Sequence, residues 1–128
     1  MTPKRVLVFG TFDGLHNGHR FVLRQAKTRG TELIVAVARD KHVQELKNKV
    51  PEHREQARLE AIKILPFVDE VVMSDEVLGS YQIINTVKPD LIILGHDQIA
   101  LEESLCDWMK EHHHYIPMQR MKKRDLYR

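Results

Sequence analysis

The fold is decided by the stretch Val6-Leu7-Val8-Phe9-Gly10-Thr11-Phe12-Asp13-Gly14-Leu15-His16-Asn17-Gly18-His19. Its first four residues are continuously apolar, which is typical of a strand buried on both faces of a parallel sheet. Apolar residues then recur with a helical period from Phe21 to Lys27, and Gly30 is placed to end that helix. A strand that enters a helix through a glycine-containing turn directs backbone N–H groups at the carboxyl edge of the sheet. The stretch therefore predicts a phosphate site at this edge.

Two histidines lie at the start of the predicted helix. His16 and His19 are three residues apart, so both rings lie on one face of the first turn and can donate to the oxygens of a triphosphate. Gly18 and Gly10 have no Cβ and let a ligand approach the backbone. Two alternatives are a pair of ordinary surface histidines and a metal-binding pair, for which Asp13 is the nearby third ligand.

The run from Gly10 to His19 resembles the HxGH signature of the cytidylyltransferase-like nucleotidyltransferases. Within that family the chain is similar to archaeal-type FAD synthases and to glycerol-3-phosphate cytidylyltransferases, from Arg5 to about Arg120. The resemblance implies an α/β fold, Rossmann-like and three-layered, with a five-stranded parallel sheet. It implies catalytic roles for His16 and His19. It also implies nucleotide contacts from Gly10, Thr11, Phe12, Asp13, His16, Gly18 and His19.

Apolar runs and helical patterns alternate along the rest of the chain, which by itself predicts a parallel sheet with helices on both faces. Further strands are expected at 33–38, 68–73, 91–94 and 115–118. Further helices are expected at 52–65, 80–87 and 101 to about 111. Because the sequence shows no repeat or linker, we expect one nucleotidyltransferase domain over residues 1–128.

Composition is ordinary for a globular protein: 42% hydrophobic and 30% charged residues in a chain of 128. A net charge of +2 is too small to suggest a duplex-binding surface, so nucleic acid is an unlikely partner. A single cysteine, Cys106, excludes an internal disulfide and fits a reducing compartment. No apolar stretch has the length of a membrane span, so the expected location is the cytoplasm, with no membrane partner.

Lysines follow the second predicted strand. Lys47 comes seven positions after Asp40, in a polar stretch expected to be irregular, and resembles the lysine with which the family holds the triphosphate and the incoming phosphate. A flexible ammonium can follow charge as it moves from the α-phosphorus to pyrophosphate, which would make Lys47 both catalytic and substrate-binding. Both Lys47 and Lys49 have the alternative of a solvated loop lysine.

Two further positions match the family's substrate contacts. Arg58, ten residues before Val68-Asp69, resembles an arginine that contacts substrate or triphosphate; its alternative is a weak ion pair on a helix surface. Asp97 matches a carboxylate that takes sugar or substrate hydroxyls or helps to organise a metal, so it is expected to contact both nucleotide and acceptor. Gln98 after it is typical of the FAD-synthase group, because the glycerol-phosphate enzymes tend to have tryptophan there.

The C-terminal sequence departs from the family's pattern. Arg120 matches an arginine that contacts the nucleotide, but a basic run, residues 122–128, stands where the family has a Ser/Thr-rich segment. Either that segment is lost, or the phosphates are held by charge alone through Lys122, Lys123 and Arg124. A solvated basic tail is the third possibility.

Together these features predict transfer of a nucleoside monophosphate to a phosphate-bearing acceptor, with release of pyrophosphate. The resemblance ranks ATP with FMN first and CTP with glycerol 3-phosphate second. It also implies Mg²⁺ or another divalent cation, with its direct ligands unassigned, and a homodimer. Two other classes stay open: a nucleotide-binding module without turnover and an RNA-linked role, whose binding would weaken steeply with salt.

Overall fold

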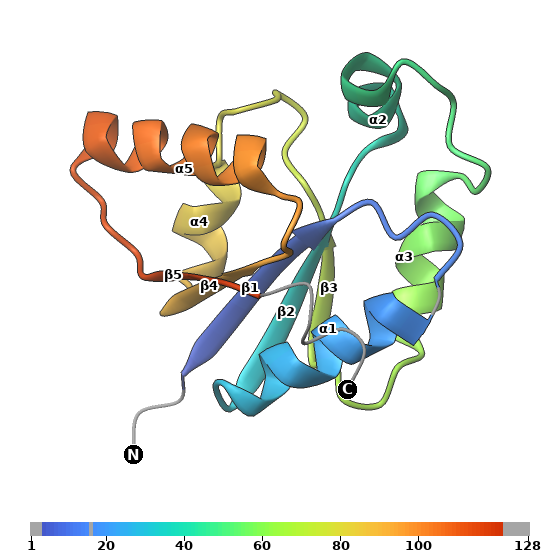
Figure 1. The fold of residues 1–128 in the computed structure, drawn as a ribbon, viewed down its shortest axis with the longest axis horizontal. Coiled ribbons are helices and arrows are strands. Elements are labelled where there is room, and N and C mark those ends of the chain that lie inside the picture. Colours follow the sequence, from blue (N-terminus) through green and yellow to red (C-terminus); the bar gives the residue numbers. More distant parts are fainter. Residues whose placement is uncertain (1–3, 16, 122–128) are drawn as a thin grey trace.

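The computed structural model describes residues 4–15 and 17–121. Its centre is a parallel sheet with the strand order β3-β2-β1-β4-β5 (Figure 1). The strands are β1 (Arg5–Gly10), β2 (Glu32–Val37), β3 (Glu70–Met73), β4 (Leu91–Leu94) and β5 (Met118–Arg120). The helices are α1 (Asn17–Thr28), α2 (Asp40–Lys47), α3 (Glu55–Lys63), α4 (Gln82–Val87) and α5 (Ile99–His112).

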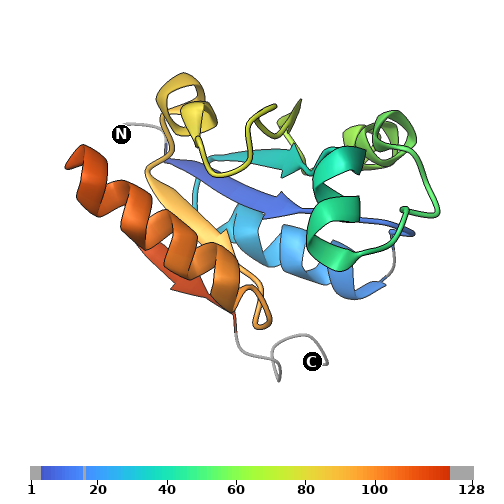
Figure 2. The same cartoon turned by 90° about the horizontal axis from the view of Figure 1, so that it is seen from above.

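Two apolar clusters, one on each face of the sheet, form the core. Successive side chains of a strand point to opposite faces, so Val6 and Val8 join α1 and α3 in one cluster while Leu7 joins α4 and α5 in the other. Figures 1 and 2 show these two helix pairs covering the two faces. The Rossmann-like three-layer fold with five parallel strands is thereby confirmed.

The expected helix and strand boundaries were wrong at several places. The third strand begins at Glu70 because Val68 closes a turn by donating its N–H to the Leu65 carbonyl. The last strand is displaced toward the C-terminus, since its pairing with β4 begins only at Met118, after Pro117. The boundaries of β2, α3, α4 and α5 differ from expectation by one to three residues, within the usual uncertainty of helix ends.

The largest error is α2, which occupies the stretch that we expected to be irregular. The helix begins at Asp40 and ends at Lys47, with Asn48 in the left-handed region as its C-cap. Charge at both ends suits the helix dipole, and His42 and Val43 are its buried residues. Val43 and Leu46 are the two aliphatic residues among its eight, which is a weak helical signal in the sequence. As a result Lys47 lies at the end of a helix, and not in a free loop.

Candidate functional site

A cavity of about 1150 Å³ opens at the carboxyl edge of the sheet. Its walls come from the β1–α1 turn, the first turn of α1, α2 with the residues after it, the loop between β3 and α4, and the β4–α5 turn. Parallel sheets of this type bind ligands at this edge. The predicted edge is thus one at which a large cavity opens.

The β1–α1 turn is shaped by Phe12. Its backbone has φ 55°, in the left-handed region, and its buried ring lies over Gly10. A Cβ on Gly10 would stand 2.5 Å from the Phe12 ring, so the ring would have to move to admit any other residue. The same ring lies edge-on to the imidazole of His19, with 5.5 Å between centroids. Phe12 therefore supports His19, which lines the cavity together with Gly18.

Gly10→Ala is expected to destabilise the protein by about 1–3 kcal/mol, since the Phe12 ring must move and the core around it is overpacked. It should also lower activity, because the displaced ring no longer supports His19. Chemical denaturation and steady-state kinetics would measure the two effects. The double variant Gly10→Ala/Phe12→Leu should recover part of the stability; no recovery would contradict a clash between these two residues.

Asp13 links the β1–α1 turn to the residues that precede α3. Its carboxylate accepts the backbone N–H groups of Glu52 and His53 at 2.8 and 2.9 Å, and the Nδ1 of His53 lies 3.0 Å away. Burial raises the pKa of Asp13, but these hydrogen bonds outweigh burial and hold the pKa below its usual value. The carboxylate is thus ionised near neutral pH and links the turn to the residues before α3. Its expected contact with nucleotide stays a prediction.

Arg58 lies beneath the site. It is 1% exposed, and its guanidinium donates to the carbonyls of His53 and Thr11 and, at 2.7 Å, to the Asp40 carboxylate. Burial raises the pKa of Asp40, but the Arg58 guanidinium and the Glu55 N–H hold that pKa below its usual value. Arg58 does not line the cavity, so the structure gives it the geometry of a support for the β1–α1 turn. Contact with substrate stays a prediction.

Lys47 reaches the cavity from the end of α2. Its Nζ donates to Thr11 Oγ1 at 3.2 Å, and both residues line the cavity. The ammonium is therefore held over the β1–α1 turn, in the cavity that His19 and Gly18 also line. Lys49 lines the cavity as well, and the hydrogen bond to Thr11 is what distinguishes Lys47 from it.

The β4–α5 turn brings Asp97 to the cavity. Asp97 is exposed there, while Gln98 joins two strand ends by donating to the Phe9 carbonyl and accepting the Gly95 N–H. The residue that distinguished the two family groups by sequence thus locks β1 to β4. Asp97 stands on a turn that this link holds in place.

The remaining predicted residues lie elsewhere. Arg120 is exposed, does not line the cavity, and forms an ion pair with Glu102 at 2.8 Å. The structure therefore brings together Gly10, Thr11, Phe12, Asp13, Gly18, His19, Lys47 and Asp97, but not Arg58 or Arg120. His16 and the basic residues 122–128 lie outside the described residues.

Sequence reasoning missed the apolar and aromatic part of the cavity. Tyr81, Val77 and Leu78 line it from the loop between β3 and α4, and Leu46 and Val50 line it from the region of α2. One signal was available: Val77-Leu78 is an apolar pair in a loop that follows a strand, at the edge where ligands bind.

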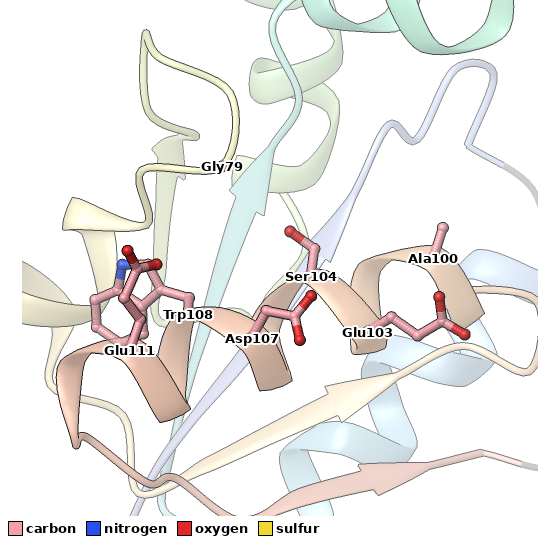
Figure 3. A pocket seen from close by; sticks show the side chains of 7 residues that line it. All are labelled: Gly79, Ala100, Glu103, Ser104, Asp107, Trp108 and Glu111. Atoms are coloured by element: carbon pink, nitrogen blue, oxygen red, sulfur yellow. The ribbon is translucent and has the colours of Figure 1, made fainter.

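A second depression, of about 410 Å³, lies along α5 beside the loop that contains Gly79 (Figure 3). Glu103, Asp107 and Glu111 follow one another along the helix at its border, and the loop at Gly79 faces them. Three carboxylates would repel a polyphosphate. The large cavity is therefore the candidate phosphate site.

Among residues 4–15 and 17–121, no group of three or more His, Cys, Asp or Glu side chains is arranged to hold a metal ion. Mg²⁺ commonly binds through substrate phosphates with one or two carboxylates, and it seldom needs an all-protein cage. Asp97, an exposed cavity carboxylate, fits that mode.

A sequence model of the family described as Cytidylyltransferase-like matches residues 7–123. A FAD synthase of Thermococcus sibiricus is 45% identical over 112 residues, which are 82% of this chain and 76% of that protein. A FAD synthase of Archaeoglobus fulgidus is 47% identical over 103 residues, 80% of this chain and 69% of that protein.

Solved structures agree on the fold. The crystal structure of a lipopolysaccharide core biosynthesis protein from Thermoplasma volcanium has a TM-score of 0.86 and 34% identity, covering 95% of this chain and 98% of that one. A pantoate-beta-alanine ligase from Francisella tularensis shares the fold alone, with a TM-score of 0.60 and 13% identity over 93% of this chain and 59% of that one. No helix in the described ranges is long and apolar enough to cross a membrane.

Proposed function

Because the chain belongs to the cytidylyltransferase-like family and is a nucleotidyltransferase, we propose that it transfers AMP from ATP to FMN, forming FAD and pyrophosphate. Its similarity to FAD synthases over most of its length supports ATP and FMN as the substrates. The observation that carries the proposal is the joining of Gly18, His19, Lys47 and Asp97 around one cavity at the carboxyl edge.

The proposed reaction is an in-line displacement. An oxygen of the FMN phosphate forms a bond to the α-phosphorus of ATP, while the bond from that phosphorus to the bridging oxygen of pyrophosphate breaks. Since the attacking phosphate is already ionised near neutral pH, no general base is required. The rate then depends on positioning and on charge compensation, as in phosphoryl transfer generally.

Each cavity residue has a proposed role in that step. His19 donates a ring N–H to the triphosphate, with His16 as a second donor on the evidence of sequence spacing alone. Negative charge develops on the equatorial oxygens and on pyrophosphate, where preset donors contribute most. Lys47 follows that charge, and Asp97 binds hydroxyls of the ribose or acceptor. Mg²⁺, bound mainly by the triphosphate with Asp97 as its protein ligand, would supply further positive charge.

Other parts of the proposal rest on the family resemblance. They are a nucleotide contact from Arg120, the extent of the nucleotidyltransferase domain over residues 1–128, a homodimer and a cytoplasmic location. Each stays a prediction.

Lys47→Ala is expected to lower kcat/KM for the complete reaction about ten- to a hundredfold, the range expected when a charged hydrogen-bonding group is lost. Its neighbour gives a matched control, since Lys49 also lines the cavity and is exposed. Lys49→Ala should change kcat/KM by less than about threefold. Equal losses in the two variants would show that general positive charge, and not the position over Thr11, is what matters.

The direct test of the proposed function is pyrophosphate release measured for ATP and CTP, each paired with FMN and with glycerol 3-phosphate. We expect release only with ATP and FMN, accompanied by FAD in the product and abolished by a metal chelator. Release with CTP and glycerol 3-phosphate would replace the proposal by the second candidate of the sequence analysis. Binding of ATP without pyrophosphate release in any pair would contradict turnover altogether.

A further inference from the structure

Exposed apolar side chains are concentrated at one part of the cavity. Seven large hydrophobic residues are well exposed in the described part of the chain, and four of them line the cavity. These four, which we call the apolar rim, are Leu46, Val50, Val77 and Leu78, with exposed fractions between 46% and 71%. Scattered surface hydrophobics need no explanation, but a cluster at the mouth of a ligand cavity indicates an apolar ligand.

The apolar rim lies opposite the phosphate half of the cavity. Leu46 belongs to α2, which follows β2, while Val77 and Leu78 belong to the loop that follows β3. His19 and Asp97 follow β1 and β4. In the order β3-β2-β1-β4 the two groups therefore occupy different halves of the carboxyl edge. The cavity has one half for phosphates and another for something apolar.

Hydrogen bonds hold the two sides of the apolar rim together at their base. Nε2 of the buried His42 in α2 lies 3.0 Å from the Glu76 carbonyl, next to Val77. Arg39 Nε donates to the Ser74 carbonyl at 2.8 Å. The Asp75 carboxylate accepts the Ser80 hydroxyl and the Ile83 N–H, which fixes the loop to α4. The part of the cavity between α2 and this loop is thus already formed before a ligand binds.

We propose that the apolar rim holds the fused aromatic ring of the acceptor, the isoalloxazine of FMN, and so selects a flavin over a small polar phosphate ester. The inference rests on the proposed function and identifies the part of the site that recognises the acceptor. Lys47 lies one residue from Leu46 and reaches toward Thr11, so it stands where the acceptor phosphate would meet the triphosphate.

Cavity size and surface chemistry both support this occupant. The cavity, about 1150 Å³, slightly exceeds the roughly 300–1,000 Å³ typical of a single small-molecule site, as expected if two large ligands bind together. A tricyclic aromatic ring gains by removing four exposed aliphatic side chains from water. Glycerol 3-phosphate has no apolar surface with which to cover them.

The test uses two double variants, Val77→Ser/Leu78→Ser and Leu46→Ser/Val50→Ser. Because all four side chains are exposed, neither change opens the core, and both variants should unfold at the wild-type temperature. We expect each to raise the Kd of FMN, measured by the change in flavin fluorescence, and the KM of FMN about tenfold or more. The KM of ATP should change by less than about twofold. Ile64→Ser and Tyr115→Ser remove exposed hydrophobics that do not line the cavity, and they should leave every value unchanged.

Three outcomes separate this inference from the proposed function. Wild-type affinity for FMN in both rim variants, with FAD still formed, would overturn the inference and leave the proposed function standing. If the rim changes raise the KM of ATP and leave the KM of FMN unchanged, the inference is also overturned, because the apolar rim would then bind adenine. If the wild-type protein forms no FAD, the proposed function fails, and FMN binding that is weakened by the rim changes would still support a flavin site.

Discussion

Replacing His19 with alanine is expected to lower kcat by about 10²–10³-fold, the loss typical of removing one preset donor to developing charge. The KM of ATP should change by less than about threefold, because the histidine donates most strongly to the transition state. His19 lines the phosphate half of the cavity, at the first turn of α1 where backbone N–H groups favour anions. Single-turnover measurements of AMP transfer would isolate the chemical step.

Two controls make the His19 result specific. His19→Asn keeps an N–H donor near the same place and should recover part of the lost kcat. His112→Ala removes a histidine stacked on Trp108, remote from the cavity, and should leave kcat unchanged. Because His19 packs against Phe12, the melting temperature of each variant must be compared. Loss of ATP affinity in step with kcat would show that His19 only binds the ground state.

Arg58→Met is expected to lower the free energy of unfolding by about 1.5–3 kcal/mol, the cost of losing charge-assisted hydrogen bonds in an ion pair whose arginine is buried and whose carboxylate is partly exposed. The substitution leaves the Asp40 carboxylate without its guanidinium and two backbone carbonyls without their donor. Urea denaturation near neutral pH would measure this loss of free energy of unfolding. Arg120→Met breaks a more exposed pair with Glu102, so its effect on stability should be much smaller than that of Arg58→Met.

The ion pair between Arg58 and Asp40 predicts that the free energy of unfolding depends on pH. The pKa of Asp40 is lower in the folded protein than its usual value of 3.8, so its stabilising contribution is present above that value. The contribution is lost as the pH falls through the folded pKa, where protonation removes the attraction to Arg58. Arg58→Met should therefore lose less stability between neutral and acid pH than the wild type does. An equal or larger loss would contradict this account of Asp40.

Strong local patterns in the sequence predicted the sheet and the edge that carries the cavity. The apolar runs of β1 and β4 predicted the sheet. The glycines and His19 after β1 predicted which edge would carry the cavity, because strand ends of a parallel sheet share one edge. Lys47 was expected at the site and does reach the cavity, although the helix that carries it was not expected.

What the sequence could not predict depends on long-range packing. Nothing local distinguishes Arg58, a buried support beneath the β1–α1 turn, from an arginine that reaches a ligand. The pairing of Arg120 with Glu102 joins β5 to α5 across 18 positions of the chain. The apolar rim combines residues from two loops that become neighbours only when β2 and β3 pair.

The central claim is that the triphosphate lies over the first turn of α1, with the apolar rim left for the acceptor. A crystal structure with an ATP analogue whose α,β-bridging oxygen is replaced by methylene tests it most directly. The account predicts phosphate oxygens within hydrogen-bonding distance of the His19 ring and of backbone N–H groups at the start of α1. A triphosphate bound along α5, at the amino edge of the sheet, or with its phosphates among the rim residues would contradict it.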